Sequence, residues 1–283
     1  MSELKELKSI ELSSFTTILT GIEIIFAIIF SIIISIAIIA FVPQGVSLAI
    51  YMIPTIVVST LMYGTYKNFF EGFLYNTLSK KLKTINIVIK DGKEIAEIST
   101  TETAIMCSII ITIEFILLYL VSVFIMPIFL TSIMQTLAMT GQMAVAFTIY
   151  QFLSIISQPT TILILIFGIF IISFVFILLG AFIYNIFANT GRGAVVKLSS
   201  ENNMTVIESI APLKLAIVST VVIGILNVIF NIIMLITGYA PITVVESIVS
   251  GFIGAFICGF LIAAFYNFLS PMLGKLKLEL IDN

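Results

Sequence analysis

Long apolar segments make up most of the chain, and a short stretch of alternating apolar and polar residues follows every second one. A helix needs about 20 apolar residues to cross the hydrocarbon core of a membrane. The segments that reach this length are residues 15–42, 47–75, 103–130, 160–188, 213–237 and 244–268. Backbone polar groups must satisfy one another within lipid, so the pattern predicts six transmembrane helices arranged as three hairpins.

A Tyr-Asn pair ends the second helix of each predicted hairpin. The three pairs are Tyr75-Asn76, Tyr184-Asn185 and Tyr266-Asn267. The apolar residues that stand 10, 12 and 14 positions beyond the tyrosines are Ile85, Ile87 and Ile89, then Ala194, Val196 and Leu198, then Leu276, Leu278 and Leu280. This alternation predicts three half-buried strands, at residues 85–90, 194–199 and 276–281. The same order of features, found three times, predicts an internal repeat.

The repeat divides the chain into residues 1–90, 91–199 and 200–283. Each unit adds two spans, so the units run parallel and would be related by a pseudo-threefold axis along the membrane normal. The predicted fold is an all-α membrane protein of six transmembrane helices, with a short cytoplasmic strand after each hairpin. We expect the three strands to pair with one another beneath the helices.

Residues 131–158 do not fit the repeat, because they are apolar but carry four glutamines. These are Gln135, Gln142, Gln151 and Gln158. A seventh span here would move the later lysines to the other side of the membrane and break the repeat. We therefore expect an insertion at the outer surface, with one or two amphipathic helices in the membrane interface. The seventh span is the alternative.

The composition narrows the class of protein. Of the 283 residues, 60% are hydrophobic and 10% are charged, with a mean hydropathy of +1.24, whereas about a quarter of the residues in soluble domains are charged. The net charge of -2 argues against a nucleic-acid partner.

Histidine is absent, which excludes histidine-bound zinc and Ser-His-Asp chemistry. Cys107 and Cys258 lack metal-like spacing, and no catalytic motif is present, so we expect no metal, no cofactor and no enzyme activity.

The cations predict an orientation in the membrane. All 13 lysine and arginine residues fall on one side of the predicted helices. The positive-inside rule then places both termini in the cytoplasm of a multi-pass protein of the inner cell membrane. One arginine against twelve lysines indicates an AT-rich prokaryotic source. The expected partners are the lipid bilayer and a cytoplasmic protein at the strands, and the sequence does not define the number of subunits.

Three polar residues stand at matching places in the first helix of each hairpin: Glu23, Glu114 and Asn227. At ~1.5 Å per residue they lie roughly 12–21 Å from the cytoplasmic helix ends, where an ionisable group costs about 2.5–3.5 kcal/mol. We expect them to converge on the pseudo-threefold axis. One interpretation is a proton or cation site, and the other is a ring of hydrogen bonds that locks the hairpins together.

Lys67 and Glu71 form an i, i+4 pair near the end of the second helix. They are either a mutually neutralised pair or a cytoplasmic gate or binding point. Asn231 shares a helix face with Asn227, and we expect it to bond across helices.

The residues of the Tyr-Asn pairs are expected at the membrane interface. The tyrosine rings would lie at headgroup level, and the asparagines would cap or cross-link helix ends. Gly251, Ala255 and Gly259 form a small-xxx-small face, which predicts close helix packing.

Around these pairs each repeat resembles a small family of two-helix membrane domains of unknown function, known mainly from actinobacteria. The third repeat begins with Ile210-Ala211-Pro212 and ends with Tyr266-Asn267 and Gly274-Lys275-Leu276. The second has Gly191-Arg192-Gly193 after its Tyr-Asn pair. The first departs most, with Leu12 for the proline and Lys83-Thr84 for the glycines. The resemblance implies two helices and a strand in each repeat, and it implies no activity.

The leading functional expectation is a non-catalytic structural or scaffold component of the membrane. The alternative is a small proton- or cation-coupled transporter or channel that uses the mid-membrane carboxylates Glu23 and Glu114. The two differ in one property, because a transporter needs a hydrated path to these carboxylates.

Overall fold

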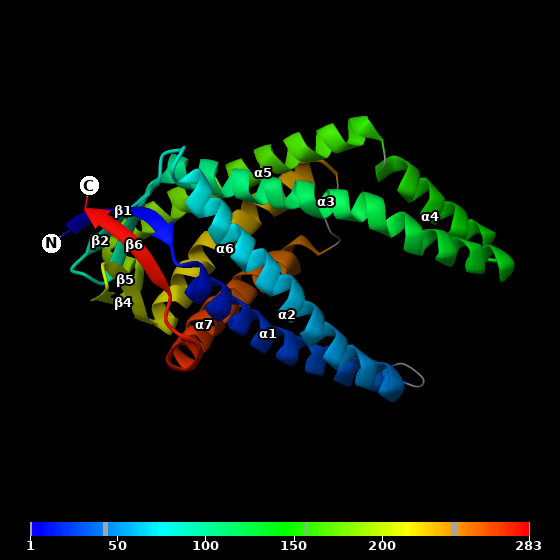
Figure 1. The fold of residues 1–283 in the computed structure, drawn as a ribbon, viewed down its shortest axis with the longest axis horizontal. Helices are drawn as coiled ribbons and strands as arrows, with labels where there is room; N and C mark the ends of the chain where they lie inside the picture. Colours follow the sequence, from blue (N-terminus) through cyan, green and yellow to red (C-terminus); the bar gives the residue numbers. More distant parts are fainter. Residues whose placement is uncertain (1, 42–44, 157, 239–242, 283) are drawn as a thin grey trace. The chain divides into compact units, whose positions relative to one another are not determined.

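A computed structural model describes residues 2–41, 45–156, 158–238 and 243–282. Within these residues, six helices are long and apolar enough to cross a membrane (Figure 1). They are α1 (Leu12–Phe41), α2 (Gly45–Leu78), α3 (Thr100–Met139), α5 (Pro159–Phe187), α6 (Pro212–Ile236) and α7 (Val244–Leu273). The six predicted helices are confirmed as long apolar helices, and the predicted end of the first one at Val42 lies outside the described residues.

The segment that did not fit the repeat is also helical. Helix α3 continues to Met139, and a shorter helix, α4 (Met143–Ile156), follows it. With 14 residues, α4 is shorter than the ~20 needed for a span. The described residues therefore favour six spans over seven, and the interfacial position of α4 stays a prediction.

The chain is not all-α, because its described residues form six strands where three were predicted. The three predicted strands are β2 (Ile85–Lys90), β4 (Ala194–Glu201) and β6 (Lys277–Asp282), here called the trailing strands. Three more, here called the leading strands, precede the hairpins as β1 (Ser2–Ile10), β3 (Glu94–Ile98) and β5 (Met204–Ile210). Each pair of long helices therefore lies between a leading and a trailing strand in the chain.

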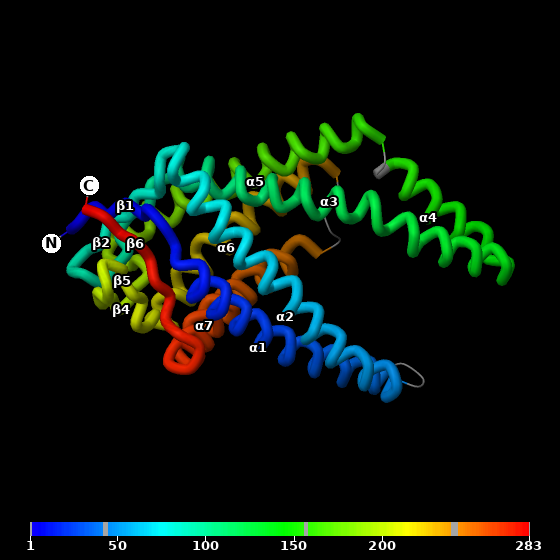
Figure 2. Tube along the Cα trace, viewed as in Figure 1, coloured from blue at the N-terminus to red at the C-terminus, as the bar shows by residue number. Residues whose placement is uncertain are grey.

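The strands form a closed antiparallel barrel in the order β1-β2-β3-β4-β5-β6. Each trailing strand pairs with two leading strands, so the prediction that the trailing strands pair with one another is wrong. The ring is closed by β1 and β6, which lie side by side at the two ends of the chain (Figure 2). Glu6 and Ile281 are partners in this last ladder.

Each leading strand carries a one-residue bulge at the same place. The register shifts between Leu7 and Ser9 in β1, between Ile95 and Glu97 in β3, and between Ile207 and Ser209 in β5. A bulge leaves one residue unpaired and bends the strand. The two apolar residues that flank each bulge are therefore three positions apart in the sequence instead of two. These pairs are Leu7 and Ile10, Ile95 and Ile98, and Ile207 and Ile210.

The chain divides into two compact units, which are described separately. One runs to residue 106 and resumes at residue 178, and it holds the barrel with α1, α2, α6 and α7. Within it, α1 packs on α2, α6 on α7, and α1 on α7. The other unit, residues 107–177, holds α4 and most of α3 and α5.

Candidate functional site

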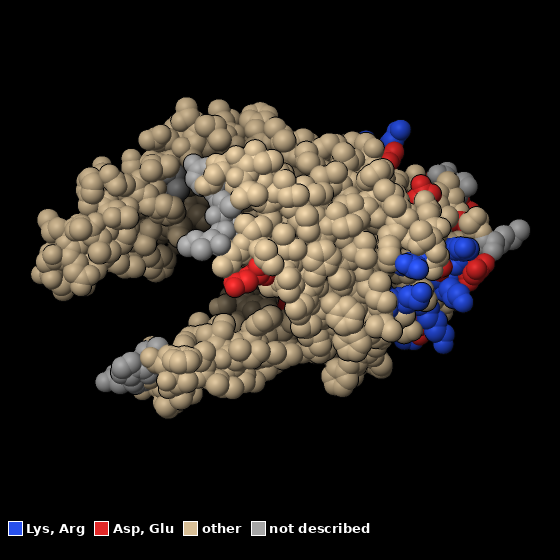
Figure 3. All heavy atoms as spheres, turned by 180° about the vertical axis from the view of Figure 1, so that it is seen from behind, with Lys and Arg blue, Asp and Glu red and all other residues tan. Residues whose placement is uncertain are grey.

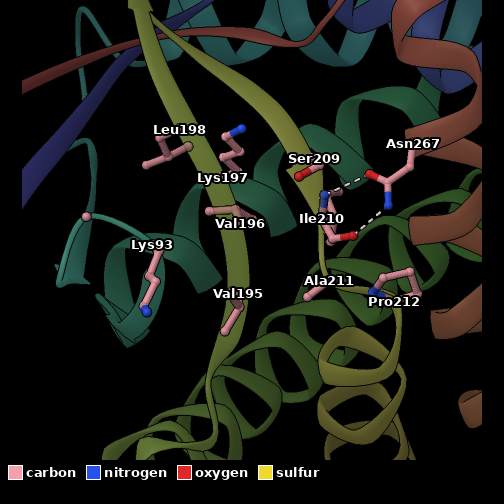
Figure 4. Close-up of a pocket in the computed structure, with 11 residues that line it drawn as sticks. Lys93, Val195, Val196, Lys197, Leu198, Ser209, Ile210, Ala211, Pro212 and Asn267 are labelled. Carbon is pink, nitrogen blue, oxygen red and sulfur yellow. Dashed lines mark hydrogen bonds between the residues drawn. The ribbon is translucent and has the colours of Figure 1, made fainter.

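The asparagine of each Tyr-Asn pair fastens a helix end to a leading strand. In the third repeat, Oδ1 of Asn267 accepts the backbone N–H of Ile210, and Nδ2 donates to the carbonyl of the same residue, both at 2.8 Å (Figure 4). Asn76 makes the same two bonds to Ile10, both at 2.8 Å. Asn185 makes them to Ile98, at 2.9 and 2.8 Å. One amide side chain thus satisfies both backbone groups of a strand residue, as a neighbouring strand would.

The tyrosine of each pair binds the same leading strand three residues earlier. The hydroxyl of Tyr75 donates to the carbonyl of Leu7 at 2.6 Å, and that of Tyr184 donates to Ile95 at 2.6 Å. Tyr266 donates in the same way to Ile207. The two bonded strand residues flank the bulge, so each pair, here called a Tyr-Asn clamp, holds the bulged part of its strand.

The clamp tyrosines are buried in protein. Tyr75, Tyr184 and Tyr266 are 4%, 8% and 2% exposed, so their rings face protein and not lipid, and their level in the membrane stays a prediction. The rings of the last two pack on the first helix of the next hairpin around the ring. Tyr184 contacts Val218 of α6, and Tyr266 lies in a cluster with Ile18 of α1.

The strand ladder then connects each repeat to the next. The residue that follows each leading strand donates its N–H to the trailing strand of the preceding repeat. These bonds run from Ser99 to Asn86 at 2.8 Å, from Ala211 to Val195 at 2.9 Å and from Glu11 to Lys277 at 3.0 Å. The clamps therefore act within repeats, whereas these three bonds act between them, and the third bond joins the last repeat to the first.

A second group of polar residues lies between α1 and α2. Nζ of Lys67 is 2.7 Å from Oε1 of Glu23 and 3.7 Å from Oε1 of Glu71. Asn68 donates to Oε2 of Glu23 at 3.0 Å and lies 3.1 Å from the hydroxyl of Thr20. These five residues, here called the α1–α2 polar cluster, join two sites that the sequence left separate.

The cluster lies well inside the helices. Glu23 is 11 residues from the start of α1, and Lys67 is 11 residues from the end of α2, so both are about 16 Å from the barrel end of their helix. Asn68 is fully buried, whereas the side chains of Glu23, Lys67 and Glu71 are about a third exposed in the absence of lipid. Lys67 thus lies within the long apolar helix α2 and not among the cations of the barrel end, with which the sequence analysis grouped it.

A glycine brings the two helices of the cluster together. A Cβ atom on Gly64 of α2 would clash with the carboxylate of Glu23. The absence of a side chain there lets this carboxylate approach α2, where Lys67 and Asn68 bind it.

The convergence of Glu23, Glu114 and Asn227 on one axis stays a prediction. Glu23 is bound within its own hairpin by Lys67 and Asn68, and Asn227 is bound within its own hairpin by Asn231. Asn231 donates to the carbonyl and Oδ1 of Asn227 at 2.8 and 3.1 Å, so this bond runs along α6 and not across helices as expected. Glu114 belongs to the other compact unit.

The small residues of α7 lie at a close helix contact. A Cβ atom on Gly259 would lie 2.6 Å from Oγ of Ser219 and 3.1 Å from Cα of Ala216, both in α6. Gly251 similarly faces the side chain of Asn227. The predicted close packing is confirmed for this helix pair.

Sequence reasoning missed Thr20, Gly64 and Asn68, and it missed the contact of Glu23 with Lys67. The sequence did contain a signal for this contact. Glu23 and Lys67 are each 11 residues from the end of their helix at the barrel, so they lie at the same height in the hairpin. The described residues contain no group of three or more potential metal-binding side chains. A scan of protein-family models and searches of curated proteins and of solved structures found no match for this chain.

Proposed function

We propose that the chain is a non-catalytic scaffold of the cell membrane, in which three helical hairpins are gathered on one cytoplasmic barrel. The observation that carries this proposal is the threefold recurrence of the Tyr-Asn clamp, with the same atoms bonded each time. The recurring polar groups are engaged in holding helices to strands. A framework of this kind is what a scaffold requires.

The distribution of charge supports the orientation. On the face shown in Figure 3, most charged side chains gather at the end of the molecule that the strands form. Twelve of the 13 cations belong to the strands or to the adjoining turns and helix ends, and Lys67 is the exception. By the positive-inside rule, this end and both termini are cytoplasmic in the proposal.

A cytoplasmic protein partner would meet the protein at the β4–β5 hairpin. Strand β4 pairs with β3 at Ala194 and Val195, and Val196 donates to the carbonyl of Lys93, but the strand continues to Glu201. Its outer part therefore extends beyond the ladder on that side, whereas β1 and β2 pair along six residues. An exposed strand edge of this kind can accept an extended peptide.

Proton or cation coupling is the second candidate, and the α1–α2 polar cluster favours it. The cluster occurs in one hairpin only. At the positions that match Lys67, Asn68 and Glu71, the other repeats have Phe176, Ile177 and Gly180, and Cys258, Gly259 and Ile262. A feature needed by the framework would recur, and ionisable residues in a span are expensive to retain without a function.

Ion flux into proteoliposomes distinguishes the two candidates. The wild type is compared with Glu23→Gln/Glu71→Gln, and with Glu3→Gln/Glu97→Gln as a control that removes two exposed carboxylates of the strands. The scaffold proposal expects no flux of protons or monovalent cations above protein-free liposomes. Flux that is lost in the cluster variant alone would establish the second candidate, and flux that is equal in all three proteins would contradict both.

A further inference from the structure

A cavity of about 430 Å³ lies on the barrel beside the start of α6 (Figure 4). The turn before β3 forms one side with Lys93, and β4 forms the floor with residues 195–198. The third side is the junction from Ser209 to Pro212, where β5 ends and α6 begins. Sites for small ligands commonly have volumes of this size.

The charges of this cavity are all positive. Its lining includes Lys93 and Lys197 and contains no aspartate or glutamate. Among the described residues, no ion pair within 4.0 Å is recorded for either lysine. Two carboxylates lie near these lysines, Asp91 near Lys93 and Glu208 near Lys197, and Glu208 is bound by Lys275 and by Ser199. These two bonds lower the pKa of Glu208, with a smaller contribution from Lys197. Both cavity lysines are therefore available to an external anion.

The remaining lining is largely apolar and includes Val195, Leu198, Ala211 and Pro212. Pro212 is the first residue of a long apolar helix, so the cavity lies where a predicted span meets the charged barrel end. In the proposed orientation, this is the level of the headgroups of the cytoplasmic leaflet. Basic pockets at this level are suited to anionic lipids, because phosphates meet lysines while the glycerol and upper chains meet apolar side chains.

The two matching positions elsewhere in the barrel do not offer a free cation, because one is the apolar Val88 and the other is Glu279, which the protein itself binds. Lys197 stands 13 residues beyond Tyr184, and Glu279 stands 13 residues beyond Tyr266. Glu279 accepts a hydrogen bond from Ser9 at 2.6 Å and lies 3.7 Å from Nζ of Lys8. That position is occupied by internal contacts, whereas the position of Lys197 opens into the cavity.

We propose that the cavity binds the phosphate group of an anionic phospholipid, with Lys93 and Lys197 as its ligands. The proposal rests on the cytoplasmic, membrane-facing position of the barrel given above, and it adds a defined lipid partner to the scaffold. Ammonium-to-phosphate contacts are charge-assisted and strong.

The test is a titration of the full chain in detergent with phosphatidylglycerol, followed by native mass spectrometry. Phosphatidylcholine and inorganic phosphate are titrated in parallel. The test variant is Lys93→Gln/Lys197→Gln, and the matched control is Lys80→Gln/Lys81→Gln, which removes two exposed lysines outside the cavity. We expect the test variant to bind phosphatidylglycerol about tenfold or more weakly than the wild type, from about 1 kcal/mol for each lysine near a membrane surface. The control should bind as the wild type does.

Equal binding by the wild type and the test variant would overturn the proposal, as would an equal loss in the control. Displacement of phosphatidylglycerol by millimolar inorganic phosphate would show a site for the free anion and would also overturn it. Circular dichroism of each variant verifies the fold. Since lipid binding is measured in detergent and ion flux in liposomes, failure of this proposal is distinguishable from failure of the scaffold proposal.

Discussion

Nζ of Lys67 lies 2.7 Å from Oε1 of Glu23, and this contact joins α1 and α2 at equal depths from the barrel. The lysine also lies 3.7 Å from Glu71, so one ammonium group serves two carboxylates. A charge in a span is expensive unless it is paired. The lysine is therefore the residue on which the electrostatics of the cluster depend.

Lys67→Gln should destabilise the protein more than Glu23→Gln does. The first change leaves two carboxylates without this counter-ion, whereas the second leaves Lys67 beside Glu71. We expect a loss of about 1–3 kcal/mol for Lys67→Gln, below the range for a fully buried pair because the side chains are partly exposed. Denaturant unfolding in detergent micelles measures the difference. A triple variant that also carries Glu23→Gln and Glu71→Gln should recover part of the loss, and equal stability of the two single variants would contradict the account.

Tyr266→Phe should lower the free energy of unfolding by about 1–2 kcal/mol. The change removes the hydrogen bond to the carbonyl of Ile207 and also an acceptor, at 3.2 Å, of the N–H of Leu276. Both backbone groups belong to the region that the clamp holds. Tyr63→Phe is the control, because this side chain in α2 is 54% exposed. The same unfolding measurement applies, and similar effects of the two changes would argue against the clamp.

Gly259→Ala should destabilise the contact of α6 with α7 by about 1–3 kcal/mol. The new methyl group would lie 3.1 Å from a backbone atom, Cα of Ala216, so the helices must move apart. Gly254→Ala in the same helix is the matched control, since nothing lies within 4 Å of its Cβ position. The control should be neutral or stabilising by up to about 1 kcal/mol, because alanine favours helix over glycine. Thermal unfolding of both variants tests the difference in sign.

The ion pair of Glu208 and Lys275 predicts a dependence of stability on pH. Hydrogen bonds from Lys275 and Ser199 lower the pKa of Glu208 below its ordinary value of 4.5. The folded state then favours the carboxylate, so the stabilisation is present above the unfolded pKa and is lost as the pH falls through the lower folded pKa. Glu208→Gln should have a modestly lower Tm than the wild type at pH 7, and the two values should converge towards pH 3. A constant difference across this range would contradict the assignment.

The helices and trailing strands could be predicted because their patterns are regular. An uninterrupted apolar segment indicates a span, and Ile85, Ile87 and Ile89 alternate without a break. The leading strands lack this signal. The bulge in β1 separates Leu7 from Ile10 by three positions, which disguises the period of two that a strand should show. No strand was therefore predicted before the hairpins.

The polar cluster could be predicted only in part. Glu23 was found because an acidic residue in a span is conspicuous. Its partner was missed because Lys67 was compared with Glu71 in its own helix and not with residues across the hairpin. Asn68 and Gly64 give no signal of their own, since their roles depend on the facing surface of α1.

The central claim is that the three hairpins are closed into one ring by the pairing of β1 with β6, and a disulfide tests it most directly. Glu6 and Ile281 are ladder partners, and the Cα atoms of such partners are about 4.5–5.5 Å apart, within the range of a disulfide. The variant is Glu6→Cys/Ile281→Cys, with Cys107→Ala and Cys258→Ala and with a protease site inserted after Asp91. The control is Glu6→Cys/Leu278→Cys in the same background. Its second cysteine lies about 10 Å along β6 from the position of Ile281, out of reach of the first.

After oxidation in membranes and protease cleavage, the account predicts that the two fragments of the Glu6/Ile281 variant migrate together without reductant and separate with it. The control fragments should separate in both conditions. Fragments of the test variant that separate without reductant, in protein that remains folded, would contradict the closed ring.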